Sequence, residues 1–144
     1  MQSIDDVKAT LDDFLDALRS KNTEQVISHY DPSNTMYVLS PPLQSTPENS
    51  QGAAGVQAWF DTFTGDRIDF EVRDLHIESS GEIAFAYFLS RMAAKKKEGP
   101  DMDIWVRNTL CFGKKGSEWK ITHQHESVPF YMDGSLRAAI DLKP

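Results

Sequence analysis

Two histidines lie in the segment WKITHQHESVPF, residues 119–130, whose pattern is typical of a β-strand. Side chains alternate between the two faces of a strand. One face is therefore expected to carry Trp119, Ile121, His123 and His125. A neutral imidazole accepts a proton near neutral pH, and two imidazoles on one face can ligate a metal ion. The histidine pair is thus the first candidate for chemistry in this chain.

The elements that must position these histidines follow from the spacing of apolar residues. Helices are predicted over about residues 4–20, 23–30, 55–64 and 134–142. Strands are predicted over about residues 35–40, 67–78, 82–94, 102–113 and 118–128. This order predicts one α+β domain over residues 1–144, with three N-terminal helices packed on a curved, mainly antiparallel sheet.

The register of the last hairpin decides where the histidines point. A two-residue turn at 115–116 would pair Phe112 with Trp119, so that apolar side chains meet. The same register places Asn108 opposite His123, on the face expected to meet the helices. The polar outer face is then expected to carry Arg107, Thr109, Lys120, Thr122, Gln124 and Glu126.

The strand over 82–94 is expected to turn its large side chains toward the helices. These are Ile83, Phe85, Tyr87, Leu89 and Arg91. The interior would then be apolar at one end and polar at the other, where Tyr87, Arg91, Asn108, His123 and His125 gather. An apolar chamber with a few converging polar groups is typical of a small-molecule pocket. Tyr37 and Trp59 are further candidates for its lining.

The chain resembles the nuclear transport factor 2-like superfamily of cone-shaped α+β domains over about residues 4–129. The resemblance rests on FLDALRSKNTEQVISHYDP near the start, GEIAFAYFLS in the middle, and RNTLCF and EWKITHQHES near the end. Within this superfamily, the chain is most similar to polyketide-cyclase-like (SnoaL-like) and ketosteroid-isomerase-like proteins. The association domain of calcium/calmodulin-dependent kinase II is also similar. The resemblance implies a helix-lined conical pocket and a homodimer through the sheet, but no single reaction.

The positions that match ketosteroid isomerase lack most of its chemistry. Its oxyanion-hole tyrosine falls at Phe14, its general base near Ser40, and its protonated aspartic acid at Asn108. Phenylalanine cannot donate a hydrogen bond and serine is a poor base, so only Asn108 keeps a donor. The matched positions also place His123 and His125 on the pocket wall.

Three interpretations of His123 and His125 remain open. Both can be hydrogen-bonded within the sheet and fix its shape. Alternatively they can line a ligand pocket, where Arg91 and a protonated histidine bind an anion and a neutral histidine moves a proton. A metal site is the third interpretation, but no Asp or Glu is expected on the same face to complete the ligand set.

Two functions follow from these interpretations. The first is binding of a small apolar carbonyl or carboxylate compound, with isomerase, cyclase or lyase chemistry. There His123 or His125 is the acid/base, and Asn108 and Arg91 stabilise negative charge. The expected pocket lining is Arg91, Tyr87, Tyr37, Trp59, Phe14 and Leu89. The alternative is a non-catalytic dimeric module that binds a ligand or assembles, and the sequence does not decide between enzyme and module.

Composition narrows the classes of partner. A formal net charge of −7 argues against a nucleic acid. No apolar run approaches the length of about 18 residues that a membrane span needs, and no basic and apolar leader begins the chain. A single cysteine, Cys111, fits a reducing compartment, so we expect a cytoplasmic protein. No G-x-G-x-x-G or P-loop motif is present, so no cofactor is predicted.

Overall fold

The computed structural model describes residues 2–144 and has the predicted α+β architecture. Its helices are α1 (Gln2–Arg19), α2 (Thr23–Ser28) and α3 (Gly52–Phe60). Its strands are β1 (Tyr30–Tyr37), β2 (Asp69–Ser80), β3 (Ile83–Ala94), β4 (Met102–Lys115) and β5 (Glu118–Ser127). The strands form one sheet in the order β1-β5-β4-β3-β2, in which β1 runs parallel to β5 and the other pairs are antiparallel.

The N-terminal helices form where the sequence predicts them. Val7, Leu11 and Phe14 are buried along one stripe of α1, as their spacing requires. On the exposed side of the same helix, Lys8 pairs with Asp12 one turn later. Asn22 caps α2, because its side chain accepts a hydrogen bond from the backbone of residue 25.

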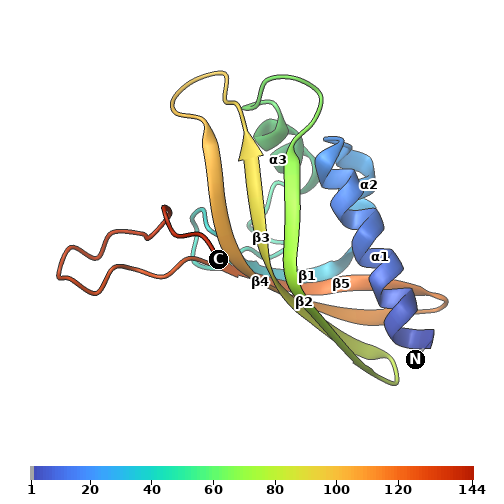
Figure 1. The fold of residues 1–144 in the computed structure, drawn as a ribbon. Helices are drawn as coiled ribbons and strands as arrows, with labels where there is room; N and C mark the ends of the chain where they lie inside the picture. The colour runs from blue at the N-terminus through green and yellow to red at the C-terminus, as the bar shows by residue number, and fades with distance from the viewer. Residues whose placement is uncertain (1) are drawn as a thin grey trace.

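The sheet curves around the helices and has two unlike faces (Figure 1). The inner face packs against α1, which contacts β2 and β5. The core lies between this face and the helices. The buried residues of the three central strands are Ala84, Ala86, Phe88, Ser90, Val106, Asn108, Leu110, Phe112, Trp119, Ile121 and Gln124. The outer face carries the alternate residues of the same strands and has no helix over it.

The predicted orientation of β3 is wrong. Ala84, Ala86, Phe88 and Ser90 point inward, whereas Ile83, Phe85 and Tyr87 are 70%, 37% and 47% exposed on the outer face. The small inward residues leave room for the phenylalanines of the helices and of the loop after α3, such as Phe14, Phe60 and Phe63. The size of the β3 side chains therefore predicts the wrong inward face. The large side chains that fill the core come from the helices and from the loop after α3, so most inward residues of β3 are small.

The predicted helix over residues 134–142 is also wrong. Residues 128–144 leave the body as an extended arm that turns back on itself, shown in red in Figure 1. Gly134 and Leu136 have positive φ angles of 88° and 55°, and this turn interrupts any helix. None of the helices within residues 2–144 is long and apolar enough to cross a membrane.

Two leucines with opposite exposure test where the core lies. Leu110 on β4 is 1% exposed and Leu43 in the loop after β1 is 98% exposed. We expect Leu110→Ala to lower the free energy of unfolding by about 3–5 kcal/mol, because it leaves a cavity among close-packed side chains. Leu43→Ala is the matched control and should change it by less than about 0.5 kcal/mol. Urea unfolding followed by circular dichroism measures both, and equal effects would contradict this core.

Candidate functional site

An extra residue in β5 determines which side chains reach the inner face. The hairpin turns at residues 116–117, so that Phe112 lies opposite Ile121, two residues beyond the predicted register. Next to this pair, Cys111 lies opposite His123, so no residue of β4 lies opposite Thr122 in the ladder. This arrangement is a β-bulge, and it shifts the alternation of β5 by one residue.

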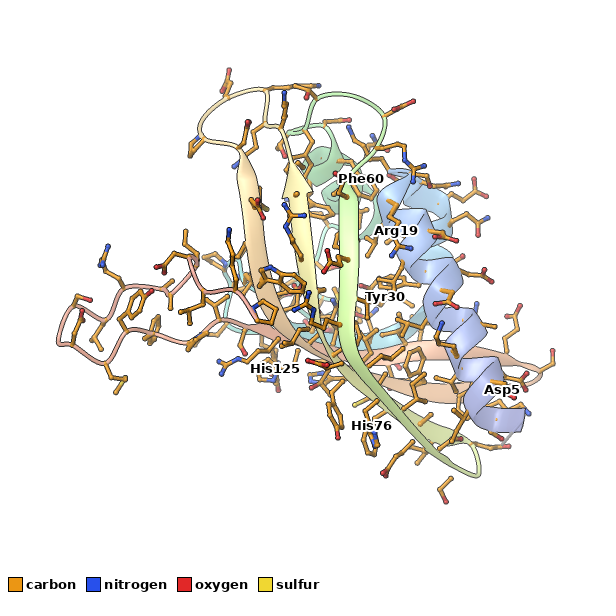
Figure 2. All side chains as sticks on the ribbon, in the orientation of Figure 1. Asp5, Arg19, Tyr30, Phe60, His76 and His125 are labelled. Carbon is orange, nitrogen blue, oxygen red and sulfur yellow. The ribbon has the colours of Figure 1, made fainter. Side chains whose placement is uncertain are left out.

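The histidines consequently lie on the outer face, and their predicted orientation is wrong. Trp119 and Ile121 point inward as expected, but the bulge turns the side chains of His123 and His125 away from the helices. Figure 2 shows His125 on the opposite side of the sheet from Tyr30. A catalytic role for the histidines therefore has no support from their position.

On the outer face the two histidines make sheet-stabilising contacts. His123 donates from Nδ1 to the carbonyl oxygen of Thr35 at 2.6 Å, which links β5 to β1. Tyr37 packs edge-on against both rings, with centroid distances of 4.8 Å to His123 and 5.4 Å to His125. Tyr37 is 38% exposed on this face and does not line an interior pocket. These contacts correspond to the interpretation in which the pair fixes the shape of the sheet.

Five polar residues on the helix side of the sheet form what we call the inner polar cluster. They are Tyr30, Ser90, Asn108, Gln124 and Glu126. The Tyr30 hydroxyl donates to Oε1 of Gln124 at 2.6 Å, and Nδ2 of Asn108 donates to the Ser90 hydroxyl at 2.6 Å. Glu126 lies directly opposite Asn108 on the neighbouring strand. Among these five, only Asn108 was predicted as a site residue; it points inward as expected, and its role in catalysis stays a prediction.

Glu126 differs from the other members of the inner polar cluster. It is half-buried, and its carboxylate has no hydrogen-bond or ion-pair partner among the described residues. Loss of water around the carboxylate disfavours its charged form, and this burial raises the pKa of Glu126 to about 7. Burial, followed by the charge of Glu126, also raises the pKa of Tyr30, so its hydroxyl stays protonated. The cluster therefore combines a carboxyl that titrates near neutral pH with neutral hydrogen-bond donors.

The remaining predicted pocket residues lie apart from this cluster. Arg91 is on the outer face, where it forms two hydrogen bonds of 2.8 and 2.9 Å with Asp103. This contact raises the pKa of Arg91 and lowers that of Asp103. Tyr87 and Leu89 belong to the same outer face, since they alternate with the buried Phe88. The prediction that these three residues line an interior pocket is wrong, because it followed from the wrong orientation of β3.

Trp59 and Phe14 are on the helix side, as predicted, and both contact other aromatic rings. Trp59 packs on Phe60 and Phe63 at centroid distances of 5.2 and 5.4 Å. Phe14 is 2% exposed and meets Tyr30 edge-on at 5.5 Å. Phe14 thus holds the ring of Tyr30 in the position from which its hydroxyl reaches Gln124.

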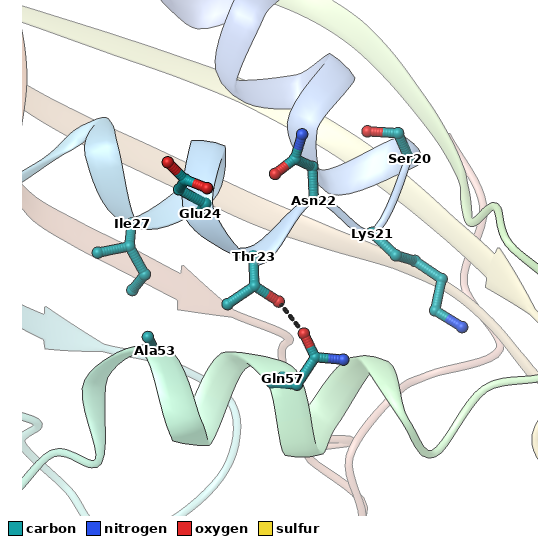
Figure 3. A pocket seen from close by; sticks show the side chains of 8 residues that line it. All are labelled: Ser20, Lys21, Asn22, Thr23, Glu24, Ile27, Ala53 and Gln57. Carbon is teal, nitrogen blue, oxygen red and sulfur yellow. Dashed lines mark hydrogen bonds between the residues drawn. The ribbon is translucent and has the colours of Figure 1, made fainter.

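Two surface hollows lie elsewhere, and neither includes a residue of the inner polar cluster. The first, of about 740 Å³, lies between the turn from α1 to α2 and helix α3 (Figure 3). Across it the Thr23 hydroxyl donates to Oε1 of Gln57 at 2.6 Å. The second, of about 660 Å³, lies between the exposed side of α1 and the start of β5. Both are open grooves lined largely by hydrogen-bonding and charged side chains, whereas small-molecule pockets are typically enclosed and mostly apolar.

Sequence reasoning missed Glu126 because periodicity gave no warning of the bulge. After Ile121 the strand is polar at every position, so either alternation fits equally well. A signal exists in the neighbouring strand. Residues 31–34 are Asp, Pro, Ser and Asn, which are typical of a turn, yet they fall inside β1, where the pairing with β5 is irregular between Tyr30 and Thr35. Pro32 cannot donate to a ladder, and a break at this point in β1 accompanies the break in β5.

A metal ion has no evident ligand set here. Within residues 2–144, no three His, Cys, Asp or Glu side chains are gathered as ligands. His123 uses one ring nitrogen for the carbonyl of Thr35, and the carboxylate of Glu126 is on the other face of the sheet. A structural or catalytic zinc site needs three or four such groups.

Known proteins resemble this chain over most of its length. A family model described as a SnoaL-like domain matches residues 7–131. The crystal structure of a nuclear transport factor 2-like protein of unknown function from Pseudomonas putida KT2440 is 22% identical, with a TM-score of 0.85 over 99% of this chain and 97% of the other. No curated protein matches the chain.

More distant structural matches carry different functional names. A putative dehydratase from Streptomyces avermitilis is 17% identical, with a TM-score of 0.73 over 88% of this chain and 95% of the other. The association domain of C. elegans calcium/calmodulin-dependent kinase II is 19% identical, with a TM-score of 0.67 over 88% and 95%. Similarity at these identities shows the fold, which is the predicted one.

The raised pKa of Glu126 makes stability depend on pH in a specific direction. The ordinary pKa of a glutamate carboxyl is 4.5, and in the folded protein Glu126 keeps its proton up to about pH 7. The contribution of Glu126 to the free energy of unfolding is therefore greatest below about pH 4.5. It falls between pH 4.5 and pH 7 and stays low above pH 7. Glu126→Gln should remove this fall and stabilise the protein at pH 8 by on the order of 2–3 kcal/mol. Urea unfolding at several pH values measures this change in the free energy of unfolding. Glu118→Gln, at an exposed position of the same strand, is the matched control.

Proposed function

The chain belongs to the SnoaL-like domain family, and from this premise we propose that it binds a small neutral carbonyl compound and moves a proton within it. The observation that carries the proposal is the half-buried, unpaired carboxyl of Glu126 in the inner polar cluster. A carboxyl whose pKa lies near the working pH is an effective general base and, once protonated, an effective acid. Many isomerase, cyclase and lyase reactions of carbonyl compounds include such a step.

Glu126 is assigned the role of proton carrier in place of the histidines. Its carboxylate would accept a proton from the carbon next to the substrate carbonyl, and an enolate would form as the C–H electrons move toward the carbonyl oxygen. Return of the proton to another carbon would give an isomer, and loss of a leaving group from the enolate would give an elimination product. The partial exposure of Glu126 supports this role, because a ligand must reach the group.

Two neutral donors of the inner polar cluster are placed to stabilise the enolate oxygen. Asn108 uses one amide hydrogen for the Ser90 hydroxyl, and its second amide hydrogen is available to a ligand. The Tyr30 hydroxyl donates to Gln124 and could switch to a ligand oxygen. Donors fixed before the reaction, in a site that excludes water, stabilise developing charge more than donors in water do.

The charge of the inner polar cluster favours a neutral substrate over a carboxylate. None of its five members is a cation, and Arg91, once assigned to bind an anion, is paired with Asp103 on the outer face. An anionic ligand beside ionised Glu126 would be repelled. The carboxylate compounds expected from the sequence are therefore set aside in favour of ketones and aldehydes.

Hydrogen–deuterium exchange at carbon tests this function without knowledge of the natural substrate. A panel of small cyclic ketones, with carboxylates of the same size for comparison, would be incubated in D2O and followed by NMR. We expect exchange into ketones only, with a rate that rises through about pH 7 as Glu126 ionises. Glu126→Gln should lower the rate by about 10²–10⁴-fold, the range for loss of a general base. Glu118→Gln on the same strand should leave it unchanged, and equal rates in both variants would overturn the role.

A second function, self-association, is favoured by the outer face of the sheet. Ile83, Phe85 and Tyr87 are exposed there without a covering helix, and Phe85 and Tyr87 stack at 6.3 Å. Exposed apolar patches of this kind mark interaction sites. Structures named as association domains and hubs share the fold. We therefore also propose a homodimer through this face, compatible with a functional inner polar cluster.

A charged substitution at the centre of the outer face tests the dimer. We expect Tyr87→Lys to shift the protein toward monomer, because the added ammonium group loses its water in an apolar contact. Leu43→Lys introduces the same charge at a side chain that is 98% exposed in another part of the surface. Sedimentation velocity over a concentration series measures the change. A monomeric native protein, or equal behaviour of the two variants, would contradict association through this face.

A further inference from the structure

The C-terminal arm, residues 128–144, has a defined shape although it projects from the body (Figure 1). The backbone of Tyr131 donates to Arg137 at 2.9 Å, and that of Ala139 donates to Pro129 at 2.8 Å. The Tyr131 hydroxyl donates to Asp141, and the guanidinium of Arg137 lies over the Tyr131 ring. These bonds hold the arm as a short hairpin.

The arm exposes an unusual amount of apolar surface for a solvent-facing hairpin. Five large apolar side chains of the arm are at least about half exposed: Phe130 (60%), Met132 (88%), Leu136 (63%), Ile140 (56%) and Leu142 (49%). Leu136 also has a φ of 55°, a conformation that a leucine rarely adopts. A polar residue or glycine would suit this turn better if the arm faced only water.

The arm and the outer face lie on the same side of the molecule. Ser127, the last residue of β5, receives a hydrogen bond from Arg107 of β4, and the arm starts at the next residue. At its other end, the carbonyl of Pro144 accepts a contact of 3.5 Å from Arg73, whose guanidinium covers the Trp105 ring of β4. Both ends of the arm are thus anchored beside the outer face, and its apolar middle reaches beyond the protomer.

We propose that the arm docks on the outer sheet face of a second copy of this chain, so that the two copies exchange arms. The proposal rests on the proposed dimer and adds the arm to its interface. A large apolar or aromatic side chain buries roughly 150–250 Å². At their exposed fractions, the arm side chains offer on the order of 500 Å² and the exposed Ile83, Phe85, Tyr87 and Tyr37 another 300–400 Å². The total is about the 800 Å² that each partner contributes to a stable interface, which neither surface reaches alone.

Charge complementarity also favours a second copy. The protein carries a formal charge of −7, so two copies repel unless the contact region is balanced. On the outer face, Asp103 is already neutralised by Arg91, and Arg107 has no carboxylate partner among the described residues. On the arm, the carboxylate of Asp133 bonds only to Ser135 within the part of the chain that the structure describes. A docked arm that places Asp133 beside Arg107 and away from Asp69 on the same face pairs this free acid with a free base.

An arm variant and a matched control separate the arm from the rest of the interface. The full-length protein would be compared with Met132→Asp, at an arm side chain that is 88% exposed, and with Leu43→Asp, at a loop side chain that is 98% exposed. Sedimentation velocity gives the dimer dissociation constant of each. We expect Met132→Asp to raise this constant at least tenfold, and Leu43→Asp to change it less than twofold. Both variants should keep the far-ultraviolet circular dichroism spectrum of the native protein, because neither side chain is in the core.

Each outcome of this comparison decides the proposal. A dimer that Met132→Asp weakens and Leu43→Asp leaves intact supports the exchanged arm. A dimer that Tyr87→Lys dissociates while Met132→Asp does not would overturn the arm and leave association through the sheet in place. A native protein that is monomeric at all concentrations would overturn both. Proton exchange by Glu126 is measured separately and is independent of these results, so the failure of one proposal is distinguishable from the failure of the other.

Discussion

The β-bulge at Thr122 is the feature on which the candidate site depends. A strand alternates with period two, so one unpaired residue exchanges the two faces for every position after it. Without the bulge, His123 and His125 would face the helices and Glu126 would face solvent. With it, a carboxyl enters the inner polar cluster and the imidazoles stay on the outer face with Tyr37. The type of acid/base group available to a ligand is therefore fixed by one residue that itself does no chemistry.

Burial of Glu126 has an energetic cost that the fold tolerates. A pKa raised from 4.5 to about 7 means that the ionised carboxyl destabilises the folded state at neutral pH. Domains of this size are stable by only about 5–15 kcal/mol, so such a cost is a noticeable fraction of the total. Glutamine at the same position would keep the shape without the charge. An unpaired, desolvated carboxyl beside two hydrogen-bond donors is a pattern by which candidate functional groups are recognised.

The sequence was sufficient to predict the order of helices and strands. It was insufficient to predict which side chains of β3 and β5 point toward the helices. Helix α1, the cap at Asn22 and the strand order of the last four strands follow from local periodicity and turn residues, which act over a few neighbours. The inward face of β3 depends on how much volume the helices fill, which no local pattern records. Glu126 depends on a pairing between β5 and β1, more than 80 residues apart in the chain. The inward face of Asn108 was predicted correctly because Asn108 lies on β4, whose alternation the bulge in β5 does not change.

Both proposals follow from the same division of the sheet into two faces. The inner face buries Ala84, Ala86 and Phe88 against the helices and holds the polar cluster at one end of β5. The outer face keeps Phe85 and Tyr87 without cover, and the arm that follows β5 adds apolar surface beside it. Glu126 and the start of the arm are separated by one residue of β5, so the two proposed surfaces begin on opposite faces of the same strand end.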